Sequence, residues 1–225
     1  MAHQDTTALQ TGIKMKIVYV YDALCGWCYG FSPVMKQFQA KHKDSLSFEV
    51  VSGGMITGER IGPVGEVAPY ISRAYKDVEK ATGVVFGDVF LKGTLEKGDA
   101  IFTSIPPAIA LSVFKSSGSD KDSVAFASAL QKAIYYDGIE PENLEAYGEI
   151  AADFGLEAGN FIEKMKDSTY MALALEDFKT SQKLQVTGFP TVFLEHDGTY
   201  HKIGSGCMPL SQLENNYSLI KNSRN

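Results

Sequence analysis

The segment KIVYVYDALCGWC covers residues 16–28 and joins a strand pattern to a pair of cysteines. Residues 16–21 are rich in Val, Ile and Tyr, which is typical of a buried strand. After the cysteines, residues 29–42 have apolar side chains close to helical spacing. Cys25 and Cys28 are therefore expected where a strand passes into the N-terminus of a helix.

This position has chemical consequences for the first cysteine. The free backbone N–H groups and the positive end of the helix dipole favour a negative charge there, so a thiolate on Cys25 would be stabilised. Two intervening residues on a helical turn let the sulfurs of Cys25 and Cys28 alternate between dithiol and disulfide. We predict a redox pair. The alternatives are half of a zinc site and two unrelated buried thiols.

The wider pattern DALCGWCYG at residues 22–30, followed by Pro33, resembles the thioredoxin-fold thiol oxidoreductases of the DsbA-like family. Trp27, directly before the second cysteine, is similar to the FrnE-like members of that family. The dipeptide departs from DsbA itself, in which a histidine precedes the second cysteine. We expect Cys25, at the exposed start of the helix, to attack, and Cys28, one turn deeper, to resolve the mixed disulfide.

Length and composition narrow the class of protein. The chain has 225 residues, a formal net charge of -6 and three cysteines. The charge argues against a nucleic-acid surface, and the cysteine count against a disulfide-stapled secreted scaffold. No segment is long and apolar enough for a membrane span, and residues 1–12 have no apolar core of a secretory signal. We therefore expect no membrane partner and a cytoplasmic location, with residues 1–14 as a disordered tail.

The order of the elements predicts the fold. Residues 45–51 form a second strand, which completes a βαβ unit. A helical block follows, with helices expected at 66–82, 106–114, 120–136, 141–154, 158–165 and 168–184, while residues 83–103 receive no firm assignment. A strand ending at residue 194, a hairpin partner at 199–203 and a helix at 209–220 close the chain. We predict an α/β, thioredoxin-like fold (βαβ…ββα) made of residues 15–56 and 185–225, with an inserted all-helical domain at 57–184.

A proline at the start of a predicted strand marks the second half of the site. Pro190 cannot donate to a sheet ladder, and a cis Phe189–Pro190 bond in a tight turn explains its place. The alternative is a trans proline that begins an edge strand. The segment TGFPT at 187–191 resembles the cis-proline loop of thioredoxin-fold proteins, and the resemblance implies that Phe189 and Pro190 lie against Cys25 and bind an extended substrate.

Other residues keep two interpretations. Trp27 forms an apolar contact for substrate or packs against the insert. Asp22 caps the turn or accepts a proton from Cys28, with capping favoured. Cys207 is a buried spectator thiol or a redox-sensitive third cysteine. A zinc site would require Cys25, Cys28, Cys207 and His201, but no second close pair mirrors the first.

The function that we predict is thiol–disulfide oxidoreductase or protein disulfide isomerase, with Cys25 and Cys28 as catalytic residues and Trp27, Phe189 and Pro190 as substrate-binding residues. Protein or small-molecule thiols and disulfides are the expected partners, glutathione among them, with no metal or organic cofactor. Two alternatives remain. One is a glutathione-dependent isomerase or transferase of the hydroxychromene-carboxylate isomerase or kappa class, which typically has a serine at the place of Cys25. The other is a non-catalytic peptide-binding module.

Overall fold

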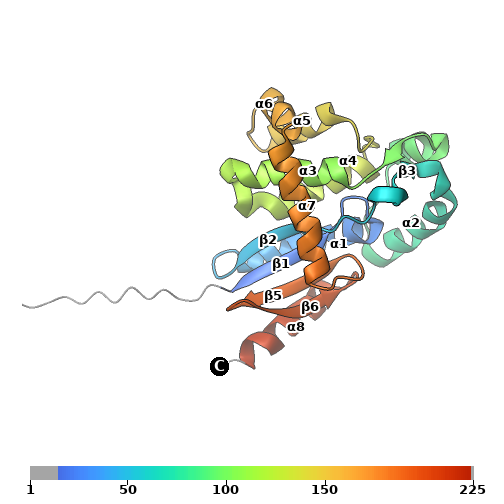
Figure 1. The fold of residues 1–225 in the computed structure, drawn as a ribbon. Helices are drawn as coiled ribbons and strands as arrows, with labels where there is room; N and C mark the ends of the chain where they lie inside the picture. Colours follow the sequence, from blue (N-terminus) through green and yellow to red (C-terminus); the bar gives the residue numbers. More distant parts are fainter. Residues whose placement is uncertain (1–14, 224–225) are drawn as a thin grey trace, which may run out of the picture.

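A four-stranded sheet forms the base of the molecule in the computed structural model, which describes residues 15–223 (Figure 1). The strand order is β2-β1-β5-β6. β1 pairs in parallel with β2 and antiparallel with β5, and β5 pairs antiparallel with β6. The strands are β1 (Lys16–Tyr21), β2 (Ser47–Ser52), β5 (Thr191–His196) and β6 (Thr199–Ser205). The tail predicted at residues 1–14 lies outside the described residues.

The central strand β1 is covered on both faces, which explains its unbroken run of apolar residues. On one face Tyr19 packs against Phe31 of helix α1 (Gly26–His42), with the ring centroids 6.2 Å apart. Helix α8 (Leu210–Asn222) contributes Leu213 to the same core. On the other face Val18 and its neighbours form a second cluster with Phe193. These strands and helices, in the order βαβ…ββα, confirm the thioredoxin-like fold.

The chain between β2 and β5 is mainly helical, as the sequence predicts. In Figure 1 helices α3, α4, α5 and α6 lie beyond one edge of the sheet, α2 lies beside them, and α7 returns the chain towards β5. Phe114 and Phe126 stack with their centroids 4.0 Å apart at the centre of this block, and Phe154 meets both rings edge-on. The helices are α2 (Ala68–Thr82), α3 (Ile105–Phe114), α4 (Ser123–Tyr135), α5 (Leu144–Asp153), α6 (Ala158–Met165) and α7 (Ser168–Lys183).

The inserted segment also contains elements that the sequence did not reveal. A two-residue strand β3 (Gly62–Pro63) pairs with β4 (Ile101–Phe102), so the insert is not purely helical. The unassigned region around residue 90 contains a π-helical turn, Val89–Leu95. Helix α5 begins later than predicted, because the side chain of Asn143 accepts a hydrogen bond from the N–H of Ala146 and caps the helix.

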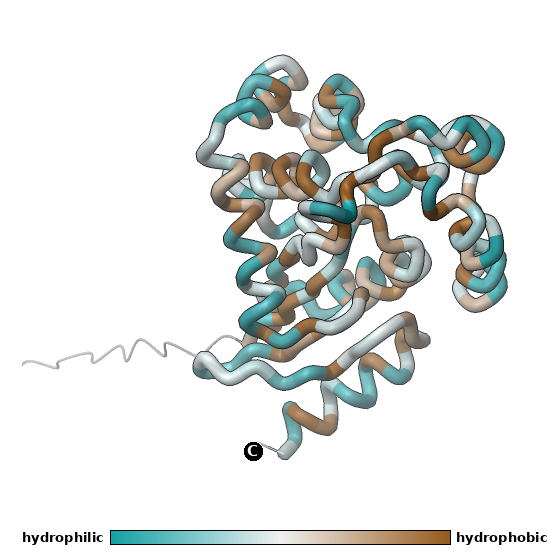
Figure 2. The backbone as a smooth tube through the Cα atoms, turned by 45° about the vertical axis from the view of Figure 1, so that its right-hand side comes forward, coloured by the Kyte–Doolittle hydropathy of each residue, from teal (hydrophilic) through white to brown (hydrophobic). Residues whose placement is uncertain are grey.

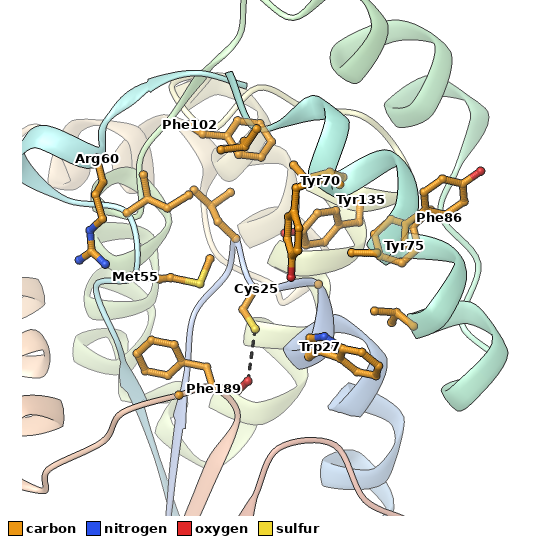
Figure 3. A pocket seen from close by; sticks show the side chains of 18 of the residues that line it. Cys25, Trp27, Met55, Arg60, Tyr70, Tyr75, Phe86, Phe102, Tyr135 and Phe189 are labelled. Atoms are coloured by element: carbon orange, nitrogen blue, oxygen red, sulfur yellow. Dashed lines mark hydrogen bonds between the residues drawn. The ribbon is translucent and has the colours of Figure 1, made fainter. Parts of the chain in front are cut away.

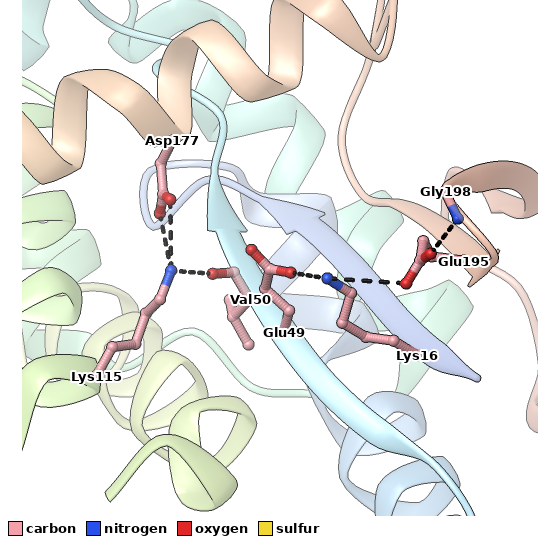
Figure 4. A network of polar contacts seen from close by, with 7 residues as sticks. All are labelled: Lys16, Glu49, Val50, Lys115, Asp177, Glu195 and Gly198. Carbon is pink, nitrogen blue, oxygen red and sulfur yellow. Dashed lines mark hydrogen bonds and ion pairs between the residues drawn. The ribbon is translucent and has the colours of Figure 1, made fainter. Parts of the chain in front are cut away.

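Polar contacts tie the insert to the sheet (Figure 4). Lys115, directly after α3, donates from Nζ to the carbonyl of Val50 on β2 at 2.9 Å and lies 3.3 Å from Asp177 Oδ1 on α7. Asp177 in turn accepts from the N–H of Ser52 at 3.0 Å. Burial raises the pKa of Asp177, and the cation beside it opposes that shift. Helices α3 and α7 are therefore held to the C-terminal end of β2.

Hydrophobic and hydrophilic residues alternate along α8 (Figure 2), as expected of a helix with one face on the sheet and one in water. Within the described residues, no helix is long and apolar enough to cross a bilayer.

Candidate active site

Cys25 is the N-cap of α1. Its backbone is extended, with φ -95° and ψ 109°, and its Sγ accepts a hydrogen bond from the N–H of Cys28 at 3.3 Å. A Ser, Thr or Asp oxygen commonly fills this position in other helices. In α1 the Cys25 sulfur takes this place and accepts a hydrogen bond from one of the N–H groups that have no partner within the helix.

Cys28 lies under Cys25 and is fully buried, whereas Cys25 keeps 7% of its surface exposed. Both are free thiols in the structure. Burial raises the pKa of the Cys28 thiol well above its ordinary value, and its hydrogen bond with Cys25 and the charge of that group add to the shift. Cys28 is thus held as a protonated thiol near neutral pH, close to the sulfur that it would attack.

The proline loop lies against Cys25. The Phe189–Pro190 peptide bond is cis, and the carbonyl of Phe189 accepts from the Cys25 thiol at 3.6 Å (Figure 3). The loop is anchored by Thr191, whose hydroxyl donates to the carbonyl of Gly188 at 2.8 Å. The sequence placed this loop beside the cysteine motif by resemblance, and the structure brings the two segments together.

Asp22 connects the cysteine turn to the insert. One carboxylate oxygen accepts from the N–H of Leu24 and from the hydroxyl of Ser104, each at 2.9 Å, and the other accepts from the N–H of Met55 at 2.8 Å. Burial raises the pKa of Asp22, and these hydrogen bonds partly oppose the shift. The bond to Leu24 is the capping role that the sequence favoured. The bonds to Met55 and Ser104 come from distant segments and have no signal in the local pattern.

A cavity of about 440 Å³ opens beside the Cys25 sulfur (Figure 3). Of the three cysteines, only Cys25 lines it. Trp27 lines the cavity and also packs against the main core, and its contact with a substrate stays a prediction. Phe189 lines the cavity as well, whereas Pro190 does not.

The sequence did not reveal the opposite wall of this cavity. It is built from side chains of the insert and of the loop after β2, namely Met55, Arg60, Tyr70, Tyr75, Phe86 and Tyr135. Tyr29 of α1 connects the two halves, because its ring stacks on Tyr135 at 5.6 Å and its hydroxyl donates to the carbonyl of Val85 at 2.9 Å. Of these residues only Phe86 lies in the region 83–103 that the sequence left unassigned. Tyr70, Tyr75 and Tyr135 lie in predicted helices, where no local pattern indicated that they line a cavity.

Cys207 is half-buried and does not line the cavity. Burial raises the pKa of its thiol, and the charge of Cys25 contributes to the shift. Among the described residues no group of three or more His, Cys, Asp or Glu side chains is placed to hold a metal ion, so the zinc alternative finds no support in the geometry.

Comparisons with known proteins agree with the fold. Residues 110–218 match the family model of the DSBA-like thioredoxin domain. A crystal structure of a candidate protein disulfide isomerase from Nitrosomonas europaea is 20% identical, with a TM-score of 0.83 over 94% of this chain and 100% of the other. The cytosolic disulfide reductase DsbM from Pseudomonas aeruginosa is 28% identical, with a TM-score of 0.74 over 92% of this chain and 98% of the other. The same reductase with GSH is similar at 26% identity and a TM-score of 0.72, over 92% and 98% of the two chains. No curated protein sequence matches the chain.

The sheet order, the Cys-x-x-Cys at a helix start and the adjacent proline loop define a thioredoxin-fold protein with a helical insert. The matching family model and the similar structures show that the chain has a DsbA-like thioredoxin fold. Its class of activity is that of a thiol–disulfide oxidoreductase.

Proposed function

We propose that Cys25 and Cys28 are the catalytic dithiol of this oxidoreductase, and that the cavity beside Cys25 receives the substrate. The observation that carries the proposal is the different access of the two sulfurs. Cys25 lines the cavity, while Cys28 is fully buried beneath it. Only one of the two can meet a substrate, and the other can react only with its neighbour.

In the reductive direction, the Cys25 thiolate attacks one sulfur of a disulfide RSSR, the S–S bond breaks, and one RSH leaves after taking up a proton. The Cys28 thiolate then attacks the Cys25 sulfur of the mixed disulfide, and the second RSH is released. The protein is left with a Cys25–Cys28 disulfide, and two electrons have passed to the substrate. The same steps in reverse oxidise a dithiol.

The N–H of Cys28 and the N-terminal end of α1 would support the first step, because both favour negative charge on the Cys25 sulfur. Once Cys25 loses its proton, the carbonyl of Phe189 loses its donor and is free to accept from a substrate N–H. We assign substrate binding to the Phe189–Pro190 loop, which would pair with an extended segment, and to the ring of Trp27.

The similar structures support the choice of partner. A cytosolic disulfide reductase that is 26% identical was solved with GSH, which favours glutathione as a small thiol partner here. Its cytosolic location likewise supports the cytoplasm for this chain. Membership of the FrnE-like branch and an isomerase activity on proteins stay predictions.

Trapping of the mixed disulfide tests the proposal. The variants Cys28→Ser, Cys25→Ser and Cys207→Ser are each reduced, desalted and incubated with glutathione disulfide, and their masses are then measured. We expect Cys28→Ser to hold one glutathione on Cys25, because its resolving thiol is gone. Cys25→Ser should form no adduct at the motif, since Cys28 is buried.

Cys207→Ser is the matched control, because it removes a cysteine that lies outside the cavity. It should react like the wild type and end as a Cys25–Cys28 disulfide. Equal trapping by Cys25→Ser and Cys28→Ser, or by neither, would show that the two sulfurs are not a redox pair. The peptide-binding module would then be the better interpretation.

A further inference from the structure

The cavity beside Cys25 contains a single formal positive charge. Its described lining is apolar and aromatic, apart from small polar groups, and Arg60 is the only Lys, Arg, Asp, Glu or His side chain in it. Arg60 ends a short 3-10 turn, Gly58–Arg60, in the loop between β2 and β3. Figure 3 shows the guanidinium group at the side of the cavity, with Met55 between it and Cys25.

The guanidinium of Arg60 is almost without partners in the protein. Its one hydrogen bond runs from Nη2 to the carbonyl of Gly54 at 3.4 Å, which is long for an N–H···O bond. Among the side chains that the structure describes, no carboxylate lies within ion-pair distance of it. A guanidinium carries five N–H donors in a planar fork that matches a carboxylate. Most of these donors are therefore available to a ligand.

We propose that Arg60 binds a carboxylate of the thiol substrate, so that the site selects peptidic thiols of about the size of glutathione over neutral thiols. This inference rests on the proposed function of Cys25. The volume of the cavity suits a small molecule, because pockets for such ligands typically measure about 300–1,000 Å³. With its sulfur at Cys25, the substrate would extend past Met55 and place its carboxylate at Arg60.

The charge of the whole chain makes this local cation more important. A net charge of -6 repels an anionic thiol, and the cavity lining offers no other cation to offset the repulsion. The pair formed with the substrate would be partly exposed to water, so salt should weaken it. A preference for carboxylate-bearing disulfides that declines with ionic strength follows from this arrangement.

The test compares three disulfides on four forms of the full-length protein. The protein is reduced and desalted, mixed with excess disulfide, quenched by alkylation, and the formation of the Cys25–Cys28 disulfide is followed by mass spectrometry. The disulfides are glutathione disulfide, the disulfide of glutathione diethyl ester, which has the same skeleton without carboxylates, and the neutral 2-hydroxyethyl disulfide. The forms are wild type, Arg60→Gln, Arg60→Lys and Arg73→Gln.

Arg73 provides the matched control, because it is an exposed arginine on α2 that does not line the cavity. We expect Arg60→Gln to lower the second-order rate constant for glutathione disulfide about tenfold, through a higher half-saturation concentration. The rate constants for the two disulfides that have no carboxylate should change less than about twofold. Arg60→Lys should retain part of the preference, since it keeps the charge but not the fork. Arg73→Gln should behave like the wild type.

The outcomes separate the two proposals. If Arg60→Gln lowers all three rate constants equally, or none of them, the role of Arg60 in carboxylate binding is overturned while the dithiol chemistry stands. If wild-type protein oxidises with 2-hydroxyethyl disulfide but shows no preference for glutathione disulfide over its ester, the inference is likewise wrong. If wild type reacts with none of the disulfides, the proposed function fails, and this inference fails with it.

Discussion

Replacing Asp22 by Asn should lower the free energy of unfolding by about 1–3 kcal/mol, although the side chain keeps its shape. Asp22 is 2% exposed and its two carboxylate oxygens accept three hydrogen bonds. An Asn can keep the bonds from Leu24 and Ser104 with its one oxygen. Its NH2 group would then face the N–H of Met55, and one buried donor would lose its acceptor.

The effect of pH follows from the direction of the pKa shift. Burial raises the pKa of Asp22 above its ordinary value of 3.8, so the folded protein binds this proton more tightly than the unfolded chain. The part of the stability that comes from this tighter proton binding is therefore fully present below pH 3.8 and is lost as the pH rises through the folded-state pKa. Because Asn does not titrate, the deficit of Asp22→Asn should be larger at about pH 4 than at about pH 7.

The assay is urea unfolding of the wild type, Asp22→Asn, Ser104→Ala and the double variant. Ser104 donates to Asp22 and accepts from the N–H of Ile56 at 2.9 Å, so its loss alone should also destabilise the protein. Since the two side chains share a hydrogen bond, we expect a coupling energy of about 0.5–1.5 kcal/mol in the double-mutant cycle.

Asp167→Asn is the control for the chemical change itself. Asp167 is exposed and caps α7 by accepting from the N–H of Thr169 at 2.8 Å, and Asn caps a helix about as well as Asp. Its free energy of unfolding should change by less than about 0.5 kcal/mol. A loss at Asp22 no larger than that, or strict additivity with Ser104→Ala, would refute the reasoning.

Three further predictions follow from other contacts. Because burial raises the pKa of the Cys28 thiol, the rate at which Cys28 resolves the mixed disulfide should rise about tenfold per pH unit between about pH 6 and pH 8. Rapid-quench kinetics would measure this rate, and a flat pH profile would contradict the role of Cys28 as the resolving thiol. Lys115→Met leaves Asp177 without its cation and should cost about 2–4 kcal/mol in urea unfolding, with most of the loss recovered when Asp177→Asn is added. Gly53→Ala would put a methyl group in steric clash with the ring of Phe189, so the ring must leave its place beside Cys25. We expect a loss of about 1–3 kcal/mol in the free energy of unfolding and slower disulfide reduction, and unchanged kinetics would show that the position of this ring is not needed.

The sequence by itself was sufficient to predict each strand and helix that has a strong local pattern. The run of Val, Ile and Tyr before Cys25 and the apolar spacing after Cys28 predicted β1 and α1, because strand and helix periods depend only on near neighbours. The same applies to the helices of the insert and to the β5–β6 hairpin, whose Asp197-Gly198 turn has positive φ at both residues. These local patterns and two short motifs were enough to predict the fold and the two sulfurs.

Tertiary structure alone decided what surrounds those sulfurs. Arg60, Tyr70 and Tyr135 reach the cavity only because the insert folds back over the N-terminus of α1, and no local period encodes such a contact. The strands β3 and β4 have two residues each, too few to show an alternation. The bonds of Asp22 to Met55 and Ser104 join segments far apart in the chain, so their existence depends on packing. Local sequence thus determined where the two thiols of the motif lie, because short-range backbone preferences set strands and helix starts. Long-range packing determined what surrounds them.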